Sequence, residues 1–143
     1  SWLMTFTAMS AWRVSESGVL TPWVAGGALV MLTGLLLETV ADQQKQAAKT
    51  LNPGGLVTGG LYARLRHPNY LGEIVYQAGL IAVAFAAAPG GWALAAGVAG
   101  PLYIVILMYY AAGDQDHQQN QRYGADPAYQ SWRNRTSCLL PGL

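Results

Sequence analysis

The sequence predicts an all-α, polytopic membrane helical bundle with three full spans and a partial span at the N-terminus. The chain of 143 residues is 52% hydrophobic and only 10% charged, and its mean hydropathy is +0.23. Three apolar runs, 23–37, 74–88 and 92–112, contain no charged residue. With their neutral neighbours, these runs can cross a bilayer core of roughly 30 Å. A soluble bundle would need more polar surface to cover them, and the length suits a single domain.

The elements follow in order along the chain. Residues 1–12 are apolar but short, so we expect the end of a span there, and no basic region of a signal peptide precedes them. A helix from about residue 26 to 49 contains the first full span. The sequences NPGG (52–55) and TGG (58–60) then predict a loop.

The second and third full spans are separated only by the PGG sequence at 89–91. Such a sequence is typical of a tight turn, which predicts that the two spans form an antiparallel hairpin. The polar segment 113–143 follows the hairpin as a C-terminal tail. Its aromatic residues argue against disorder.

The distribution of positive charge predicts the orientation. Seven of the eight Lys and Arg residues lie in the connection 38–70 or in the tail 113–143, whereas Arg13 alone lies in the connection on the opposite side. The positive-inside rule therefore predicts that loop 38–70 and the C-terminal tail are cytoplasmic. The short, Ala- and Gly-rich chain fits an integral protein of a bacterial inner membrane. A net charge of +1 gives no indication of nucleic-acid binding, and we expect none.

Polar residues converge on the predicted cytoplasmic side from three segments. In the first segment, Glu38, Asp42, Lys45 and Lys49 are spaced four, three and four residues apart, which places them on one helix face. These residues form either a solvated stripe of ion pairs or one wall of a site. Convergence with the other two segments favours the site.

The second segment is RLRHPNYLGE at 64–73. Pro68 cannot lie inside a helix, so we expect Asn69 and Tyr70 to begin the next one. The exposed amides of a helix start, together with nearby Arg and His side chains, suit a phosphate or carboxylate. Glu73 then lies near the lipid boundary, where an ionisable group is costly and usually functional. Anchoring of lipid headgroups is the alternative role for the arginines. The candidate residues in this segment are Arg64, Arg66, His67, Asn69, Tyr70 and Glu73.

The third segment is the tail, where Tyr123, Tyr129 and Trp132 lie among arginines. Aromatic rings can stack on a flat base while guanidinium groups bind phosphates, which is the combination that a nucleotide needs. The chain has neither a GxGxxG turn after a strand nor a Walker loop, so a Rossmann or P-loop fold is excluded. The single cysteine, Cys138, excludes an internal disulfide and, with only two histidines, predicts packing and no metal site.

Three sequences, LLETVADQQK (36–45), GGLYARLRHPNYLGE (59–73) and YGADPAYQSWRNRTSCLLPGL (123–143), resemble in order and spacing the C-terminal region of the membrane-embedded steroid 5-alpha-reductase family. The tail also looks like that of the related sterol C14 and C7 reductases. Isoprenylcysteine carboxyl methyltransferases share the R-H-P-x-Y-x-G turn but bind S-adenosylmethionine. Glu38, Asp42, Asn69 and Glu73 favour the reductases.

The resemblance implies NADPH-dependent reduction of a carbon–carbon double bond in a lipophilic, steroid- or sterol-like substrate. An S-adenosylmethionine-dependent methyltransferase and an inactive membrane scaffold are the alternatives. The residues expected to bind the cofactor are Glu38, Asp42, Lys45, Arg64, Arg66, His67, Asn69, Tyr70, Glu73, Asp116, Arg122, Tyr129 and Arg133.

In those reductases, earlier helices help to enclose the substrate, and this chain does not contain them. We therefore expect a longer protein, a homo-oligomer, a partner chain that supplies further helices, or a reduced and inactive member. The proton donor is not assigned. Four tyrosines within or near the spans are candidates for the proton donor, although packing or a position at the membrane interface explains each of them as well. They are Tyr76, Tyr103, Tyr109 and Tyr110.

Overall fold

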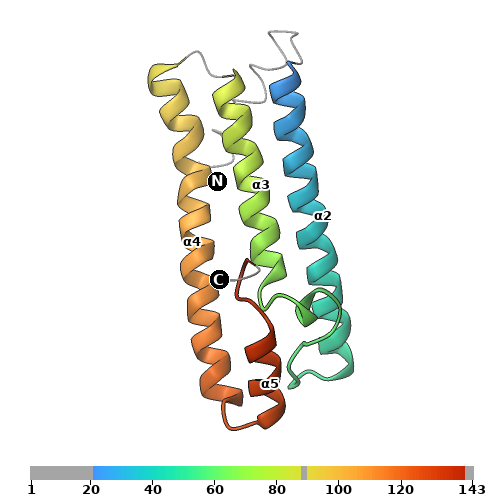
Figure 1. The fold of residues 1–143 in the computed structure, drawn as a ribbon. Helices are drawn as coiled ribbons and strands as arrows, with labels where there is room; N and C mark the ends of the chain where they lie inside the picture. Colours follow the sequence, from blue (N-terminus) through green and yellow to red (C-terminus); the bar gives the residue numbers. More distant parts are fainter. Residues whose placement is uncertain (1–20, 88–89, 141–143) are drawn as a thin grey trace.

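A computed structural model describes residues 21–87 and 90–140, and this part of the chain is helical (Figure 1). Its elements are α2 (Pro22–Leu51), the short 3-10 helix η1 (Gly60–Ala63), α3 (Pro68–Ala87), α4 (Gly91–Tyr123) and α5 (Pro127–Arg135). Within the described residues, α2, α3 and α4 are long and apolar enough to cross a membrane. The all-α membrane fold is therefore confirmed, whereas the partial span predicted at 1–12 lies outside the described residues.

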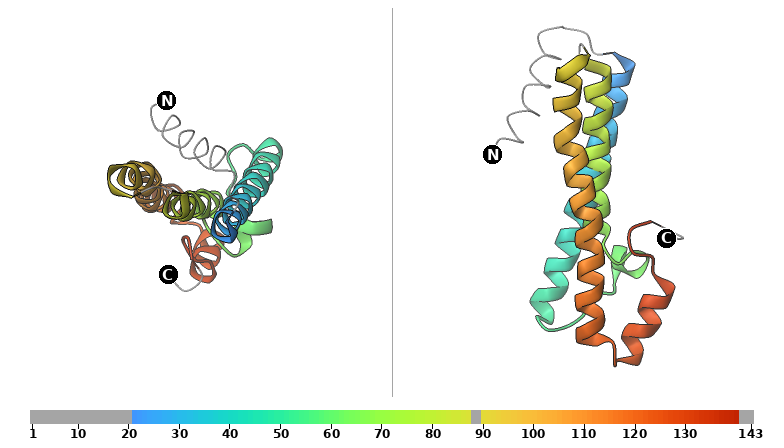
Figure 2. Two further views of the ribbon diagram at one scale, coloured as in Figure 1. Left: turned by 90° about the horizontal axis from the view of Figure 1, so that it is seen from above. Right: turned by 90° about the vertical axis from the view of Figure 1, so that its left-hand side faces the viewer.

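The three long helices form a layer with α3 in the middle. Helix α3 packs against α2 on one side and α4 on the other, and consecutive helices run in opposite directions (Figures 1 and 2). The antiparallel hairpin of α3 and α4 agrees with the sequence prediction. No other long helix of the described residues packs on the outer faces of α2 and α4, and large apolar side chains of these helices, such as Trp23, Leu29 and Tyr103, are exposed. Lipid is the natural environment for such faces.

Helix α2 begins earlier than predicted, because Pro22 occupies its first turn and the hydroxyl of Thr21 caps it by accepting from the Val24 amide at 3.3 Å. Helix α3 begins at Pro68, one residue before the predicted start, because proline fits the first position of a helix. The third helix does not end with its apolar run at residue 112, since α4 continues to Tyr123. Residues 113–123 contain no proline and extend the buried face of Ala112 to Asp116, so part of the predicted tail is helix.

Glycines allow α2 and α3 to approach closely. A Cβ added at Gly72 would lie 2.5 Å from the Glu38 amide nitrogen, and one added at Gly79 would lie 2.6 Å from the Met31 nitrogen. On the facing helix, a Cβ at Gly34 would lie 2.6 Å from the Gly72 carbonyl oxygen. Small residues that bring two backbones into contact are a common means of helix association in membranes. We call Gly27, Gly34, Gly72 and Gly79 the glycine seam.

Exposed aromatic side chains lie near both ends of the apolar part of α4. Trp92 is 75% exposed near one end of the helix, and Tyr109 and Tyr110 are 66% and 67% exposed further along. Helix geometry places Trp92 and Tyr109 about 26 Å apart along the axis, close to the thickness of a hydrocarbon core, and aromatic rings are common at both membrane interfaces. The polar end of α4, from Asp114 onward, lies beyond this apolar part.

We predict that Gly34→Leu destabilises the protein by roughly 3 kcal/mol, because the new side chain would meet the α3 backbone at Gly72 and Tyr76. Gly26→Leu is the matched control, since an added Cβ at Gly26 on the same helix meets nothing within 4 Å. Unfolding in mixed micelles, followed by far-UV circular dichroism, measures both variants. Equal losses of stability would contradict a tight glycine seam.

Candidate functional site: a cationic pocket at the polar end

At the polar end of the helical layer, α2, the loop 52–67, the start of α3, α4 and α5 meet (Figure 1). Side chains from these elements line a pocket. Its volume is about 210 Å³, which is smaller than most sites that enclose a whole small molecule. The pocket therefore suits one part of a larger ligand. It is lined by Lys45, Lys49, Leu56, Val57, Tyr62, Arg66, His67, Asn69, Tyr70, Gln115, Gln118, Gln119, Arg122, Tyr123 and Trp132.

The carboxylate of Asp116 joins α4 to the segment before α3. The Asp116 oxygens accept from the Nε of Arg66 at 2.9 and 3.1 Å and pair with its second terminal nitrogen at 2.9 Å. The Nε2 of His67 lies 2.7 Å from the same carboxylate. Although burial alone would raise the pKa of Asp116, the hydrogen bonds from His67 and Arg66 lower it from 3.8 to about 2.

Arg66 also joins the C-terminal segment to this centre. Its remaining terminal nitrogen donates to the carbonyl oxygens of Arg133, at 3.2 Å, and Thr136. The backbone continues the connection, because the amide of Arg66 donates to the Ser137 carbonyl at 2.8 Å and that of His67 to the Cys138 carbonyl at 3.2 Å. Arg66 therefore adds a charged donor to carbonyl groups at the end of α5, where the Arg133 carbonyl otherwise accepts only long contacts of 3.4 Å from Thr136.

Four further hydrogen bonds hold the pocket walls. The indole of Trp132 donates to the Tyr62 carbonyl at 2.7 Å, and the Tyr123 hydroxyl donates to the Gly54 carbonyl at 2.9 Å. Two contacts from α2 fix the loop, since the side-chain oxygen of Gln44 accepts from the Leu61 amide at 2.8 Å and Lys49 donates to the Gly55 carbonyl at 2.7 Å. The loop is thus anchored to α2, α4 and α5.

The pocket is lined by cations and by no carboxylate. Arg66 is neutralised by Asp116, whereas Lys45, Lys49 and Arg122 form no ion pair with any described carboxylate. The stripe of ion pairs considered for the first segment is accordingly not seen. Uncompensated positive charge in a concave site attracts anions.

Two buried side-chain polar atoms of the pocket residues have no hydrogen-bond partner among the described residues. They are the hydroxyl of Tyr62, a residue that is only 4% exposed, and the side-chain oxygen of Gln119, both without a hydrogen bond among the described residues. Burial, and after it the nearby charge of Asp42, raises the pKa of Tyr62, so its phenol stays neutral and able to donate. An unpaired buried hydroxyl is costly unless a ligand supplies the partner.

The structure brings some of the predicted site residues to the pocket and leaves others outside. Those that line it are Lys45, Arg66, His67, Asn69, Tyr70 and Arg122. Outside the lining are Glu38, Asp42, Arg64, Glu73, Asp116, Tyr129 and Arg133. Glu73 accepts from Gln77 one turn along α3, Arg133 donates to Asn120 at 3.0 Å, and the side chain of Arg64 is exposed. Direct contact of these outer residues with a cofactor stays a prediction.

Sequence reasoning did not select Tyr62, Gln119 or Trp132 as ligand contacts, although all three line the pocket. Trp132 was visible as an aromatic residue among arginines. Gln119 belongs to a stretch of similar polar residues, and no spacing distinguishes it. Tyr62 sits between the loop glycines and the arginines, and only the fold shows that it is buried.

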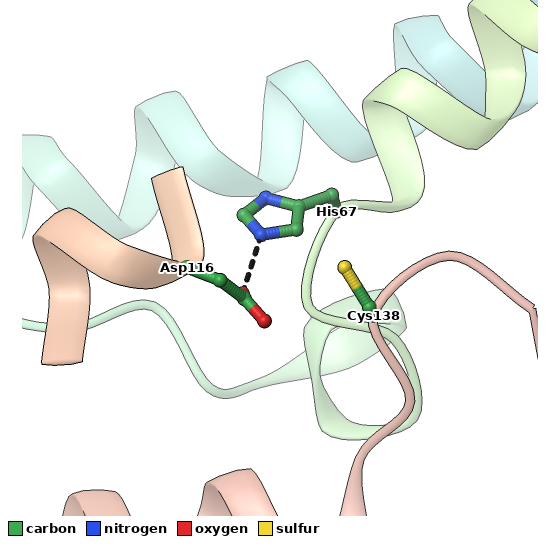
Figure 3. Close-up of side chains that lie close together, drawn as sticks. All are labelled: His67, Asp116 and Cys138. Atoms are coloured by element: carbon green, nitrogen blue, oxygen red, sulfur yellow. Dashed lines mark hydrogen bonds and ion pairs between the residues drawn. The ribbon is translucent and has the colours of Figure 1, made fainter. Parts of the chain in front are cut away.

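The structure also gathers His67, Asp116 and Cys138, whose potential ligand atoms lie within 4.8 Å of one another (Figure 3). Their sequence spacing gave no indication of this cluster. Both oxygens of Asp116 already pair with Arg66, and burial raises the pKa of the Cys138 thiol, which keeps it protonated. A metal ion would have to displace the Arg66 guanidinium group and the thiol proton. We therefore assign the cluster to the ion-pair centre that Asp116 forms with Arg66 and His67.

We predict that Asp116→Asn flattens the acid limb of the stability profile. The lowered pKa of Asp116 means that its ionised form stabilises the fold by roughly 2 kcal/mol above about pH 4, and that this contribution disappears as the pH falls towards 2. Unfolding in micelles between pH 2 and 7 measures it. The exposed Asp114, on the same helix, supplies the control Asp114→Asn. An unchanged acid limb in Asp116→Asn would contradict the assignment.

Comparison with known proteins adds three findings. No solved structure matches the chain. The "Probable O-methyltransferase ustE" of Ustilaginoidea virens is 29% identical over 80 residues, which are 54% of this chain. The match covers only 28% of that relative's length. The model of the family described as "Protein of unknown function (DUF1295)" matches residues 1–136, and the chain belongs to this family.

Proposed function

We propose that the protein is a membrane-embedded, NADPH-dependent reductase of a carbon–carbon double bond in a lipophilic, steroid- or sterol-like substrate. The observation that carries the proposal is the charge of the pocket. Three cations that form no ion pair with a described carboxylate, Lys45, Lys49 and Arg122, line a pocket to which no carboxylate contributes. The motif resemblance to the steroid 5-alpha-reductase family supports the same reaction.

The charge of the pocket favours NADPH over S-adenosylmethionine. NADPH carries three phosphate groups and is strongly anionic, whereas S-adenosylmethionine carries a sulfonium and an ammonium group against one carboxylate. Cations in a partly enclosed site attract the first ligand and repel the second. A pocket built for the sulfonium would be expected to contain an acidic wall without free cations. The aromatic side chains of this pocket suit either ligand, so its charge is what favours NADPH.

The position of the pocket suits a reaction between a water-soluble cofactor and a lipid-soluble substrate. The pocket lies beyond the apolar parts of α2 and α4, while Glu38 and Glu73 lie closer to the membrane. When bound, NADPH would supply the hydride. The protein would hold the phosphates through its cations, and the stacked rings of His67 and Tyr70, 5.5 Å apart, would offer a flat face beside them.

The proposal extends to location and partners. Placing the polar end on the cytoplasmic side of a bacterial inner membrane follows the positive-inside rule and gives the pocket access to soluble NADPH. The uncovered faces of α2 and α4 offer surface to lipid and to the helices of a homo-oligomer or partner chain that would complete the substrate site. These assignments depend on the reductase proposal.

A lipid O-methyltransferase that uses S-adenosylmethionine is the second candidate. It is favoured by the printed name of the Ustilaginoidea virens relative and by the R-H-P-x-Y-x-G turn. An S-adenosylmethionine-binding pocket here would need the ligand's carboxylate to lie against Lys45 or Arg122. The two candidates therefore make opposite predictions for ligands without phosphate.

We predict that purified protein in micelles binds NADPH saturably and binds S-adenosylmethionine at least tenfold more weakly. Energy transfer from tryptophan to the reduced nicotinamide reports NADPH binding, because Trp132 lines the pocket. The double variant Lys45→Ala/Arg122→Ala should lose tenfold or more of the NADPH affinity. Arg135→Ala is the control, since Arg135 is exposed and outside the lining.

Tight binding of S-adenosylmethionine, with none of NADPH, would overturn the reductase in favour of the methyltransferase. Binding of neither ligand would favour an inactive scaffold. Equal NADPH affinities for the double variant and Arg135→Ala would show that the pocket is not the cofactor site.

A further inference from the structure

We infer that the pocket holds the phosphorylated ribose of the nucleotide, with the Tyr62 phenol donating a hydrogen bond to its 2′-phosphate. Tyr62 would thus be a specificity residue that distinguishes NADPH from NADH. The inference rests on the proposed function and assigns a role to a side chain that the motif resemblance did not select.

The first step concerns which end of the nucleotide enters the pocket. Lys45 and Lys49 follow Glu38 by seven and eleven residues, so they lie about 10 and 16 Å further along α2, away from the membrane. The hydride-donating ring has to meet a substrate dissolved in lipid. The opposite end of the cofactor, with its phosphorylated ribose, then lies beside Lys45 and Lys49.

The second step concerns charge. A phosphate monoester carries up to two negative charges, more than either phosphate of the diphosphate bridge, and binds best where several cations converge. Lys45 and Lys49 come from α2 and Arg122 from the polar end of α4, so they reach the pocket from two helices. The Lys49 ammonium group donates to the Gly55 carbonyl at 2.7 Å and to the Pro53 carbonyl at 3.4 Å, which leaves the third of its three hydrogens for a ligand.

The third step concerns Tyr62. Its backbone is fixed, since its carbonyl accepts from Trp132 and the neighbouring Leu61 amide donates to Gln44. Its hydroxyl has no partner within the described part of the chain, although the residue is almost fully buried. A neutral hydroxyl that has no partner, on a residue that lines the pocket, is a donor whose hydrogen bond an anionic ligand oxygen can accept.

Gln119 completes the arrangement. It lies three residues before Arg122, hence on the same face of α4, and its side-chain oxygen is the other buried pocket atom without a partner. A free acceptor next to a cation suits a group that has both a phosphate oxygen and a hydrogen donor. The phosphorylated ribose, with its neighbouring hydroxyl, has both.

The test compares Tyr62→Phe with Ser131→Ala. Both variants remove a side-chain hydroxyl, but only Tyr62 lines the pocket, whereas Ser131 is exposed on α5. Neither loses a protein hydrogen bond, so both should fold with the wild-type circular dichroism and thermal transition. Dissociation constants for NADPH and NADH are measured by energy transfer, and 2′,5′-ADP is measured as a competitor of NADPH.

We expect Tyr62→Phe to weaken binding of NADPH and 2′,5′-ADP by about tenfold and to leave NADH unchanged, while Ser131→Ala changes none of them. If Tyr62→Phe matches Ser131→Ala, or weakens NADPH and NADH equally, the inference is overturned while the reductase proposal stands. If wild-type protein does not bind NADPH, both fall together.

Discussion

The carboxylate of Asp116 is the contact on which the polar end of the molecule depends. It binds Arg66 and His67, which are 50 and 49 residues away in the sequence, and so fixes the polar part of α4 against the start of α3. Arg66 extends the connection to the carbonyl groups that end α5. Each partner is buried, so an unpaired charge in this centre would carry a large desolvation cost, and the three segments are held in one arrangement.

This ion-pair centre separates two kinds of cation. Arg66 lines the pocket but is already neutralised, and it acts through the carbonyls and the carboxylate that it holds. Lys45, Lys49 and Arg122 keep their charge for a ligand. An arginine suits the first role because its planar group can bind a carboxylate and two carbonyls at the same time, whereas lysine cannot reproduce this geometry. The charge available to a ligand therefore comes from α2 and α4 rather than from the R-H-P-N-Y turn itself.

Much of the fold was predictable because apolar runs without charge, a PGG turn and Pro68 each act locally. The convergence of three polar segments was also predictable, because two spans separate the connection 38–70 from the tail and so place both on the same side of the membrane. What the sequence could not provide were the pairings: nothing near Asp116 distinguishes it from Asp114 as the partner of Arg66, because the choice depends on which face of α4 packs inward. The continuation of α4 to Tyr123 depends on the same buried face. Tyr62 was missed since burial, and not residue type, makes its hydroxyl a binding group.

The pocket lies between two rigid contacts, the glycine seam within the membrane and the ion-pair centre outside it. The seam sets the separation of α2 and α3, and hence the distance from Lys45 to Asn69 and Tyr70, because backbone atoms touch at Gly72 and Glu38. The ion-pair centre sets the position of α4 and α5 against the same loop. The walls are therefore fixed by contacts that use no ligand. Among the described residues, the three cations have no carboxylate partner and the Tyr62 hydroxyl has no hydrogen bond. Such a site loses little conformational freedom when an anion binds, so the attraction of its cations is available for affinity and for selection among anions.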